Sequence, residues 1–324
     1  MKTIITLTMN PAIDKNSSVD HVVPERKLYC SAPRFEPGGG GINVSRAIKK
    51  LGGESLALYP CGGSAGAMLR SLFDQEGLTH RPVPVAGCSR ENLIVLEEAT
   101  GQQYRFGMPG PTLADEEWQR CLEEIFSNQE GPDYIVASGS LPPGVPVDFY
   151  ARIARLGKQR GARVVIDTSG EALRLAMAEG VYLIKPNIRE FRDLMGAGMG
   201  EEEEIRKMAQ KVISDGRCEV VVISLGAAGV LMVSGAGQER LHPPAVPIIS
   251  KVGAGDSMVA GMVLSLARGD ALRDAVRFGV AAGTAAVMTP GSELCRRADA
   301  ERIYRQMAPV KYTGSDSNTS VPQD

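Results

Sequence analysis

The amino-acid sequence predicts an α/β fold with a mostly parallel central sheet flanked by helices, into which a small discontinuous β-sheet is inserted. From about residue 112 onward, apolar runs of strand length alternate with segments of helical period, which is typical of parallel strands joined by helices. Residues 15–35 and 90–108 break this rhythm and carry strand patterns without a crossover helix. Glycine is clustered in the run Gly38–Gly41, which indicates that backbone approaches a ligand closely.

The first expected strand lies at the amino-terminal end of the chain. Its apolar stretch after Lys2 is short and is stopped by Asn10-Pro11, so we interpret it as a buried strand rather than a signal peptide. In the second inserted stretch, apolar residues flank the turn Ala99–Gly101 and predict antiparallel pairing. We expect the two inserted stretches to form one small sheet that lies over the site as a lid or serves as a dimer contact.

The remaining strands and helices follow from about residue 112. Residues 114–126 predict a helix with acids in its first turn and Trp118, Leu122 and Ile125 on one face, and residues 201–213 predict a helix that opens with four glutamates. Acidic first turns suit the positive end of the helix dipole. Buried strands are expected at Tyr134–Ala137, Arg163–Ile166, Tyr182–Ile184 and Val220–Ile223.

The chain length fits one large domain with an insertion. We expect a single domain over residues 1–309, because 324 residues lie within the range of one sizeable α/β domain. After about Pro309 the chain is rich in Ser, Thr, Asp and Asn and lacks apolar period. Residues 310–324 are therefore predicted to be a disordered tail.

Composition excludes several classes of function. A formal net charge of −2 offers no strong basic field, so nucleic acid is not an expected partner. Six scattered cysteines and three histidines form neither a zinc motif nor a disulfide framework, which favours a cytoplasmic chain with reduced thiols. The longest apolar stretch, residues 220–233, contains Ser224 and glycines and is too short to span a bilayer, so no membrane segment is expected.

The sharpest chemical signal is the segment Gly253-Ala254-Gly255-Asp256, which precedes a helical pattern that runs through Ala267. Glycines before a helix leave its first N–H groups accessible to an anion. An aspartate in this turn is explained equally well as a helix cap. Dinucleotide-binding and P-loop motifs are absent, because no glycine run has their spacing.

Here the residues resemble a known family. Gly253–Asp256 is similar to the second signature of the PfkB/ribokinase sugar kinases, and Gly38–Ala47 is similar to the first. The resemblance extends from Thr6–Asp14 to about Met307 and implies a ribokinase-like fold. Within the family, the segments most similar to those of its ATP-dependent 6-phosphofructokinase members are Phe35–Asn43, Tyr104–Phe106, Ser138–Gly144 and Ser169–Leu173.

The resemblance implies a catalytic site. Asp256 would take the proton from the attacking sugar hydroxyl, while the amides of Gly253, Ala254 and Gly255 would stabilise the transferring phosphoryl group. Asn187 and Glu190 match the family's N-x-x-E motif, which acts on Mg²⁺. A helix start with an acidic first turn is the alternative interpretation of this pair.

The resemblance also places the nucleotide ATP. Lys185 precedes the N-x-x-E motif, and Ser224, Gly226 and Gly229 form a loop that would lie against the nucleotide, although an ordinary glycine hairpin has the same pattern. Gly283 and Thr284 match positions near the adenine or ribose. Core packing alone would also explain that late helix.

On the sugar side, the resemblance assigns substrate contacts to two groups of residues. Family positions for sugar hydroxyls are matched by Asp14, Gly38, Gly39, Asn43, Ser138 and Gly139. Arg90 matches the arginine that holds the phosphate of phosphosugar substrates, and Lys27 and Arg105 would add positive charge from the lid. As an alternative, a lid surface that contacts only solvent would also carry arginine and lysine.

The expected reaction is phosphorylation of fructose 6-phosphate, a phosphorylated ketohexose, to fructose 1,6-bisphosphate, with a homodimer formed through the lid. Tagatose-6-phosphate kinase and 1-phosphofructokinase activities stay open, and a non-catalytic sensor of phosphosugars or nucleotides is a distant alternative. The family's potassium site lies near residues 250, 252 and 286–293, where Pro290 and Glu293 depart from the expected pattern. K⁺ activation and regulation by a second ATP therefore stay undecided.

Overall fold

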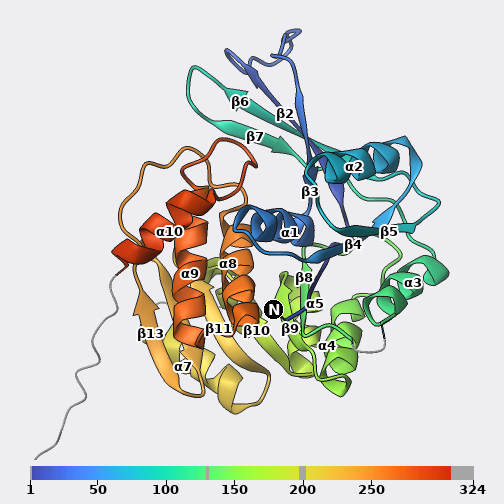
Figure 1. Ribbon diagram of the computed structural model, residues 1–324. Helices are drawn as coiled ribbons and strands as arrows, with labels where there is room; N and C mark the ends of the chain where they lie inside the picture. Colours follow the sequence, from blue (N-terminus) through green and yellow to red (C-terminus); the bar gives the residue numbers. More distant parts are fainter. Residues whose placement is uncertain (1, 129–130, 197–201, 308–324) are drawn as a thin grey trace, which may run out of the picture.

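The computed structural model describes residues 2–128, 131–196 and 202–307 (Figure 1). The expected tail, residues 310–324, and Glu201, the first residue of one predicted helix, lie outside this part. The strands are β1 Ile4–Leu7, β2 Ala12–Val19, β3 Arg34–Gly38, β4 Leu56–Cys61, β5 His80–Pro84, β6 Arg90–Glu97, β7 Gln103–Phe106, β8 Tyr134–Ser138, β9 Arg163–Asp167, β10 Val181–Ile184, β11 Cys218–Ser224, β12 Val230–Ser234 and β13 Gly237–Leu241. The helices are α1 Gly40–Lys50, α2 Gly63–Gln75, α3 Asp115–Ile125, α4 Phe149–Gln159, α5 Gly170–Ala178, α6 Ile188–Met195, α7 Glu202–Ser214, the 3₁₀ turn η1 Gly226–Ala228, α8 Ala254–Arg268, α9 Leu272–Ala286 and α10 Arg297–Gln306.

The central sheet of the described chain has the order β13-β12-β11-β10-β9-β8-β1-β4-β5. Strands from β11 to β5 are parallel, whereas β12 and β13 form an antiparallel hairpin at one edge. The mostly parallel sheet is thus confirmed, and the four strands expected between residues 134 and 223 form β8, β9, β10 and β11. The pair β4 and β5 with helix α2, which precedes residue 112, was missed.

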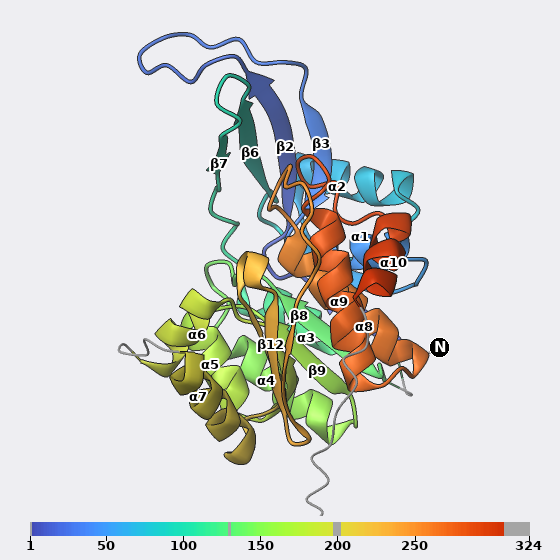
Figure 2. The ribbon, with the colours of Figure 1, turned by 90° about the vertical axis from the view of Figure 1, so that its left-hand side faces the viewer.

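Side chains that alternate along the strands of the sheet pack into two separate cores, one on each face. Tyr134 and Val136 of β8 pack with α1, α8, α9 and α10, while Ile135 and Ala137 pack with helices α3 to α7. Figure 2 shows these two helix layers on opposite faces of the sheet. Strands buried on both faces read as continuous apolar runs, which is why sequence patterns located them well.

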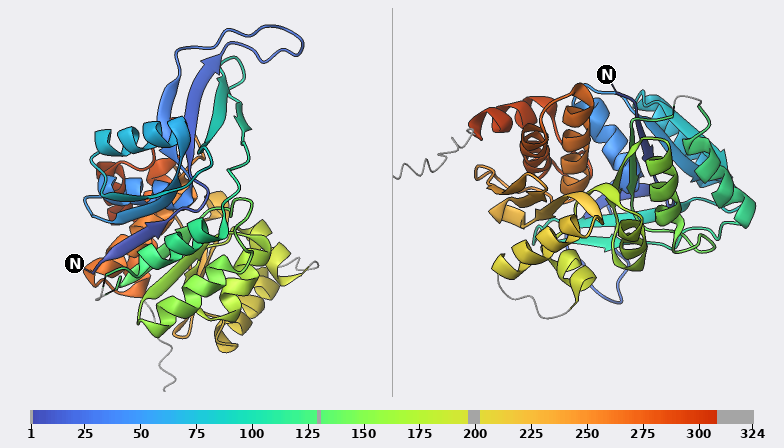
Figure 3. Two further views of the ribbon diagram at one scale, coloured as in Figure 1. Left: turned by 90° about the vertical axis from the view of Figure 1, so that its right-hand side faces the viewer. Right: turned by 90° about the horizontal axis from the view of Figure 1, so that it is seen from below.

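The small sheet projects from the carboxyl-terminal edge of the large one (Figure 3) and has the order β3-β2-β6-β7. The antiparallel pairs are β2 with β3 and β6 with β7, but β2 and β6 run parallel, so the purely antiparallel expectation was wrong. Strands β2 and β6 both run away from the central sheet, so they point in the same direction. Another correction concerns residues 20–33, which form a loop without strand structure between β2 and β3.

The helices that the structure describes include none with both the length and the apolar character needed to cross a membrane.

Candidate active site

Parallel strands end at a common edge, and a cavity of about 440 Å³ lies there. Strands β8, β9 and β11 deliver Ser138, Asp167 and Ser224 to it from their carboxyl ends, and Lys185 follows β10 directly. The start of α8 closes the opposite side. The lining residues are Gly40, Ser138, Gly139, Ser140, Asp167, Thr168, Ser169, Lys185, Asn187, Glu190, Ser224, Gly253, Gly255 and Asp256.

Helix α8 begins at the cavity with a left-handed turn. Gly253 is its N-cap residue at φ 69°, and a Cβ atom there would lie 2.3 Å from Cδ2 of Leu294. Ser257 makes the first bond of the helix, to the carbonyl of Gly253, so the amides of Ala254, Gly255 and Asp256 precede the helical ladder. The N–H donors of the predicted anion site therefore lie at the cavity.

The carboxylate of Asp256 does not act as a helix cap. Its Oδ2 accepts a 2.9 Å bond from Nδ2 of Asn43 on α1, and no side chain caps the start of α8. Burial raises the pKa of Asp256 to about 7, with a further contribution from Asp167, whereas Asn43 and Lys185 oppose the rise. A carboxylate with a pKa near neutrality suits proton transfer.

Lys185 provides a buried positive charge beside this carboxylate. Its Nζ lies 3.3 Å from Oδ1 of Asp167, and its side chain is 8% exposed. Burial opposes the charge, yet Asp167 and Asp256 raise the pKa of the lysine above its usual value. Asp167 was missed by sequence reasoning, although its place at the end of a buried strand was a usable signal.

Asn187 and Glu190 form the start of α6 at the cavity. Oδ1 of Asn187 accepts from the amide of Glu190 at 2.9 Å, and Oε2 of Glu190 accepts from the amide of Asn187 at 2.8 Å. This is a capping box, so the alternative interpretation of the pair as a helix start is confirmed, whereas its role on Mg²⁺ stays a prediction. The described chain contains no cluster of three or more His, Cys, Asp or Glu side chains able to hold a metal.

A metal here would therefore rest on one or two carboxylates, water and the phosphates of a nucleotide. That donor set fits Mg²⁺, which keeps several of its waters and binds through one or two carboxylates together with substrate phosphates. Glu190 and Asn187, the residues predicted to act on Mg²⁺, both line the cavity and have side-chain oxygen atoms.

The base of the small sheet carries the predicted sugar contacts. Asp14 on β2 is 8% exposed and accepts from Nδ2 of Asn92 at 2.8 Å. Burial raises its pKa, while Asn92, Arg90 and Arg46 oppose the rise. A Cβ atom on Gly38 would lie 2.3 Å from Oδ2 of Asp14, so only glycine fits beside this carboxylate.

The quadruple glycine lets α1 start against the strand ends. A Cβ atom on Gly40 would lie 2.2 Å from Oγ of Ser138, and one on Gly39, at φ 114°, would lie 2.6 Å from Thr8. Gly139, next to Ser138, is fixed by the hydroxyl of Tyr150, which donates to its carbonyl at 2.9 Å. The buried Oδ1 of Asn43 has no hydrogen-bond partner among the residues that the structure describes, so a ligand hydroxyl would satisfy it.

Three of the predicted nucleotide residues, Ser224, Gly226 and Gly229, lie at the end of β11 and in the loop that follows it. Ser224 lines the cavity, whereas a Cβ atom on Gly229, at φ 86°, would lie 2.0 Å from the carbonyl oxygen of Leu241, so the β12–β13 hairpin requires this glycine. Gly226, at φ 64°, starts η1 in open space.

Helix α9 supplies the other two predicted nucleotide positions. Gly283 packs on the first turn of α8, where a Cβ atom would lie 3.0 Å from the carbonyl oxygen of Ala254. Thr284 bonds the carbonyl of Val280 at 2.7 Å within its own helix. These contacts correspond to the packing interpretation.

The three predicted lid cations occupy different places. Arg90 donates to the carbonyls of Asn10, at 2.9 Å, and Met108, at 3.0 Å, which holds it at the base of the small sheet beside Asp14. Arg105 bonds Gln103 on the same strand, and Nζ of Lys27 lies 5.1 Å from the ring centroid of Tyr29. The structure brings Arg90, but neither Lys27 nor Arg105, to the sugar side.

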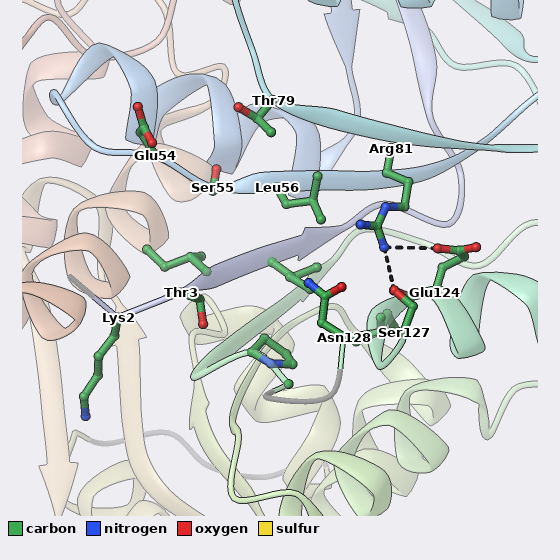
Figure 4. A pocket seen from close by; sticks show the side chains of 15 residues that line it. Lys2, Thr3, Glu54, Ser55, Leu56, Thr79, Arg81, Glu124, Ser127 and Asn128 are labelled. Atoms are coloured by element: carbon green, nitrogen blue, oxygen red, sulfur yellow. Dashed lines mark hydrogen bonds and ion pairs between the residues drawn. The ribbon is translucent and has the colours of Figure 1, made fainter.

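Another hollow, of about 350 Å³, lies at the opposite edge of the sheet, near the start of β1 (Figure 4). Its guanidinium, Arg81, is paired with Glu124 at 3.1 Å and bonded to Ser127 at 2.7 Å. Lys2 is the other cation that lines this hollow, and its Nζ lies 6.0 Å from the ring centroid of Tyr134.

Comparison with known proteins agrees with the geometry. A family model described as pfkB family carbohydrate kinase matches residues 4–299. An ATP-dependent 6-phosphofructokinase isozyme 2 of Mycobacterium tuberculosis is 44% identical over 97% of this chain and 92% of the relative. The Escherichia coli protein of the same name is 42% identical over 95% and 100%, and a 1-phosphofructokinase of Bacillus subtilis is 34% identical over 96% and 99%.

Solved structures of the E. coli phosphofructokinase-2 are also similar. Its complex with fructose-6-phosphate has a TM-score of 0.90 at 42% identity, covering 95% of this chain and 99% of that one. Its complex with potassium has a TM-score of 0.91 with the same identity and coverage, and a further structure is described as a tetrameric inhibited form. A Thermotoga maritima ribokinase, at 20% identity and a TM-score of 0.76, shares the fold, over 94% of this chain and 100% of that one.

Proposed function

Because this chain belongs to the pfkB family of carbohydrate kinases, we propose that it transfers the terminal phosphoryl group of ATP to fructose 6-phosphate and forms fructose 1,6-bisphosphate. The observation that carries this proposal is the position of Asp256. Its carboxylate lies between the free amides at the start of α8 and the amide of Asn43, in a cavity that also holds Lys185. The relatives named 6-phosphofructokinase are 42–44% identical, against 34% for the 1-phosphofructokinase.

The proposed mechanism uses Asp256 as the general base. The O–H bond of the sugar hydroxyl breaks, its proton moves to the carboxylate, and the oxygen forms the new bond to phosphorus as ADP leaves. The amides of Gly253, Ala254 and Gly255 stabilise the charge that develops on the transferring group. Lys185 adds a positive charge next to these amides, since a Cβ atom on Gly255 would lie 3.2 Å from its Nζ.

ATP brings the phosphoryl group with its metal ion, for which Mg²⁺ is proposed. Asn187 and Glu190 would hold that ion through oxygen atoms and water. Ser224 and the adjoining Gly226 turn would lie along the nucleotide, with Gly283 and Thr284 on the far side of the start of α8.

Substrate selection is assigned to the sugar side. Asp14 and Asn43 would bind hydroxyls, with Gly38, Gly39, Ser138 and Gly139 allowing close approach. Arg90 would hold the existing phosphate, because three of its five N–H groups bond carbonyls within the described residues and the guanidinium keeps donors for an anion. Lys27 and Arg105 would contact the substrate phosphate only if the lid moved or if they came from a partner subunit.

A homodimer through the small sheet is part of this proposal. β3 and β7 are its edge strands, and it exposes Phe106 at 49% and Leu96 at 40%. Exposed apolar residues beside unpaired strand edges favour association. We expect Phe106→Asp to yield a smaller species than the natural chain in analytical ultracentrifugation; an unchanged mass would rule out this interface.

Potassium activation would require a cation to bind backbone carbonyls beside the start of α8. The carbonyls of Val287 and Gly291 already accept from Ser250, through its amide and its hydroxyl at 3.2 Å and 3.1 Å, so a cation would have to share them. The proposed compartment is the cytoplasm, where the six free thiols would stay reduced.

The deciding experiment compares kcat/KM for fructose 6-phosphate, tagatose 6-phosphate and fructose 1-phosphate, each with and without K⁺. We expect fructose 6-phosphate to be preferred and unphosphorylated fructose to be poor. Preference for fructose 1-phosphate would instead assign a 1-phosphofructokinase. Absence of coupled ADP release with any of these sugars would favour the sensor alternative.

A further inference from the structure

A buried carboxylate outside the reaction site connects four segments of the chain. Glu36 on β3 is 5% exposed, and the hydroxyl of Ser292 donates to its Oε2. Nδ2 of Asn16 on β2 donates to the same oxygen at 3.1 Å, and the guanidinium of Arg46 on α1 lies 3.5 Å from the other oxygen. Arg34 adds an exposed contact at 3.2 Å. With its oxygens occupied, Glu36 binds protein groups rather than substrate.

Arg46 extends this contact into the main body. Its side chain is 2% exposed and forms a two-pronged pair with Glu76 at the end of α2, at 2.7 Å and 2.9 Å. It also donates to the carbonyls of Pro37 and Ser292, each at 3.3 Å. A buried guanidinium is tolerated when its donors are satisfied in this way. One turn earlier on the same helix lies Asn43, which contacts Asp256.

Ser292 belongs to the segment 287–294, which supports the start of α8. The hydroxyl of Ser250 donates to the carbonyl of Gly291 at 3.1 Å and accepts from the amide of Val252 at 3.2 Å. Leu294 fills the space beside Gly253. The position of the segment therefore decides where the phosphate-binding amides lie.

We propose that Glu36, Arg46 and Ser292 form a clamp that fixes the phosphoryl side of the site against the sugar side. Glu36 lies opposite Asp14 in the β2–β3 pair, so the clamp starts from the strands that carry the sugar contacts. Its other end, through segment 287–294, reaches the amides of α8. Glu36 and Ser292 are thus positioning residues whose effect falls on alignment of the two substrates. This inference rests on the proposed kinase function.

The test is a double-mutant cycle of Ser292→Ala and Glu36→Gln, assayed with whichever phosphosugar the natural chain uses best. Each single variant is expected to lower kcat by roughly tenfold, because small misalignments of reactants are costly, while both KM values stay near those of the natural chain. The double variant should be no slower than the slower single variant, since Ser292→Ala removes a contact that Glu36→Gln has already weakened.

The matched control is Ser45→Ala, which removes another buried hydroxyl, bonded to Thr6 at 2.7 Å, on the same helix as Arg46. It should lower the melting temperature about as much as Ser292→Ala with unchanged kcat. Unchanged kcat in Ser292→Ala, or multiplicative losses in the double variant, would overturn the clamp. Lack of turnover in the natural chain would instead refute the proposed function, so the two failures are distinguishable.

Discussion

Nδ2 of Asn43 lies 2.9 Å from Oδ2 of Asp256, across a sequence separation of 213 residues. The bond joins the two glycine-rich helix starts, α1 and α8, at one carboxylate. It favours the charged form of Asp256, whereas burial and the negative charge of Asp167 favour the protonated form. The protonation of the proposed base is therefore set by groups from three separate elements.

The pH dependence of kcat/KM should follow this balance. A base must be deprotonated to work, so activity should rise with pH through an acidic limb near pH 7, the pKa of Asp256. Removal of the negative charge in Asp167→Asn should move the limb to lower pH. Loss of the amide donor in Asn43→Ala should move it to higher pH. Shifts of the same sign in both variants would contradict the assignment.

Substitution of the base itself should separate chemistry from binding. Asp256→Asn keeps the size of the side chain but cannot accept the proton, so kcat should fall by on the order of 10² to 10⁴. ATP affinity, measured by calorimetry, should change little. The control is Asp215→Asn, an exposed aspartate after α7, which should keep normal turnover. Normal turnover in Asp256→Asn would exclude this residue as the base.

The two roles of Glu190 can be separated by one substitution. Glutamine also completes a capping box at this position, so Glu190→Gln should keep the melting temperature of the natural chain. The Mg²⁺ concentration needed for half-maximal rate should rise by roughly 10- to 100-fold if the carboxylate acts on the metal. Titration of activity with free Mg²⁺ measures this. An unchanged requirement would leave Glu190 with its capping role alone.

Recognition of the substrate phosphate should depend on Arg90. A charge-assisted bond contributes about 1.5–3 kcal/mol, so Arg90→Ala should raise KM for fructose 6-phosphate by roughly 10- to 100-fold. The rate with unphosphorylated fructose should stay the same. Arg155→Ala, which breaks an exposed pair between α4 and Glu179 at the end of α5, is the control. Equal losses with both sugars would show that Arg90 supports the fold instead.

Sequence reasoning located the buried strands of the central sheet better than the lid. The residues 134–138, 163–167 and 218–224 are strands buried on both sides, and their apolar runs are local signals. Asp256 was predicted as the base from the resemblance of a local glycine motif, and it lines the cavity. By contrast, the parallel pairing of β2 with β6 and the loop at residues 20–33 depend on partners far along the chain, which no local pattern encodes.

The residues of the chain determined on their own which segments after residue 112 become the buried strands β8 to β11, where glycine permits a helix to start, and which carboxylate stands at that start. Tertiary packing alone decided that Asp167 and Lys185 lie next to Asp256, and that Glu36 meets Ser292 across 256 residues. Local structure follows from steric and apolar preferences of neighbouring residues. The pKa of a base and the contacts of a buried carboxylate follow from burial and from charges that only the folded chain brings together.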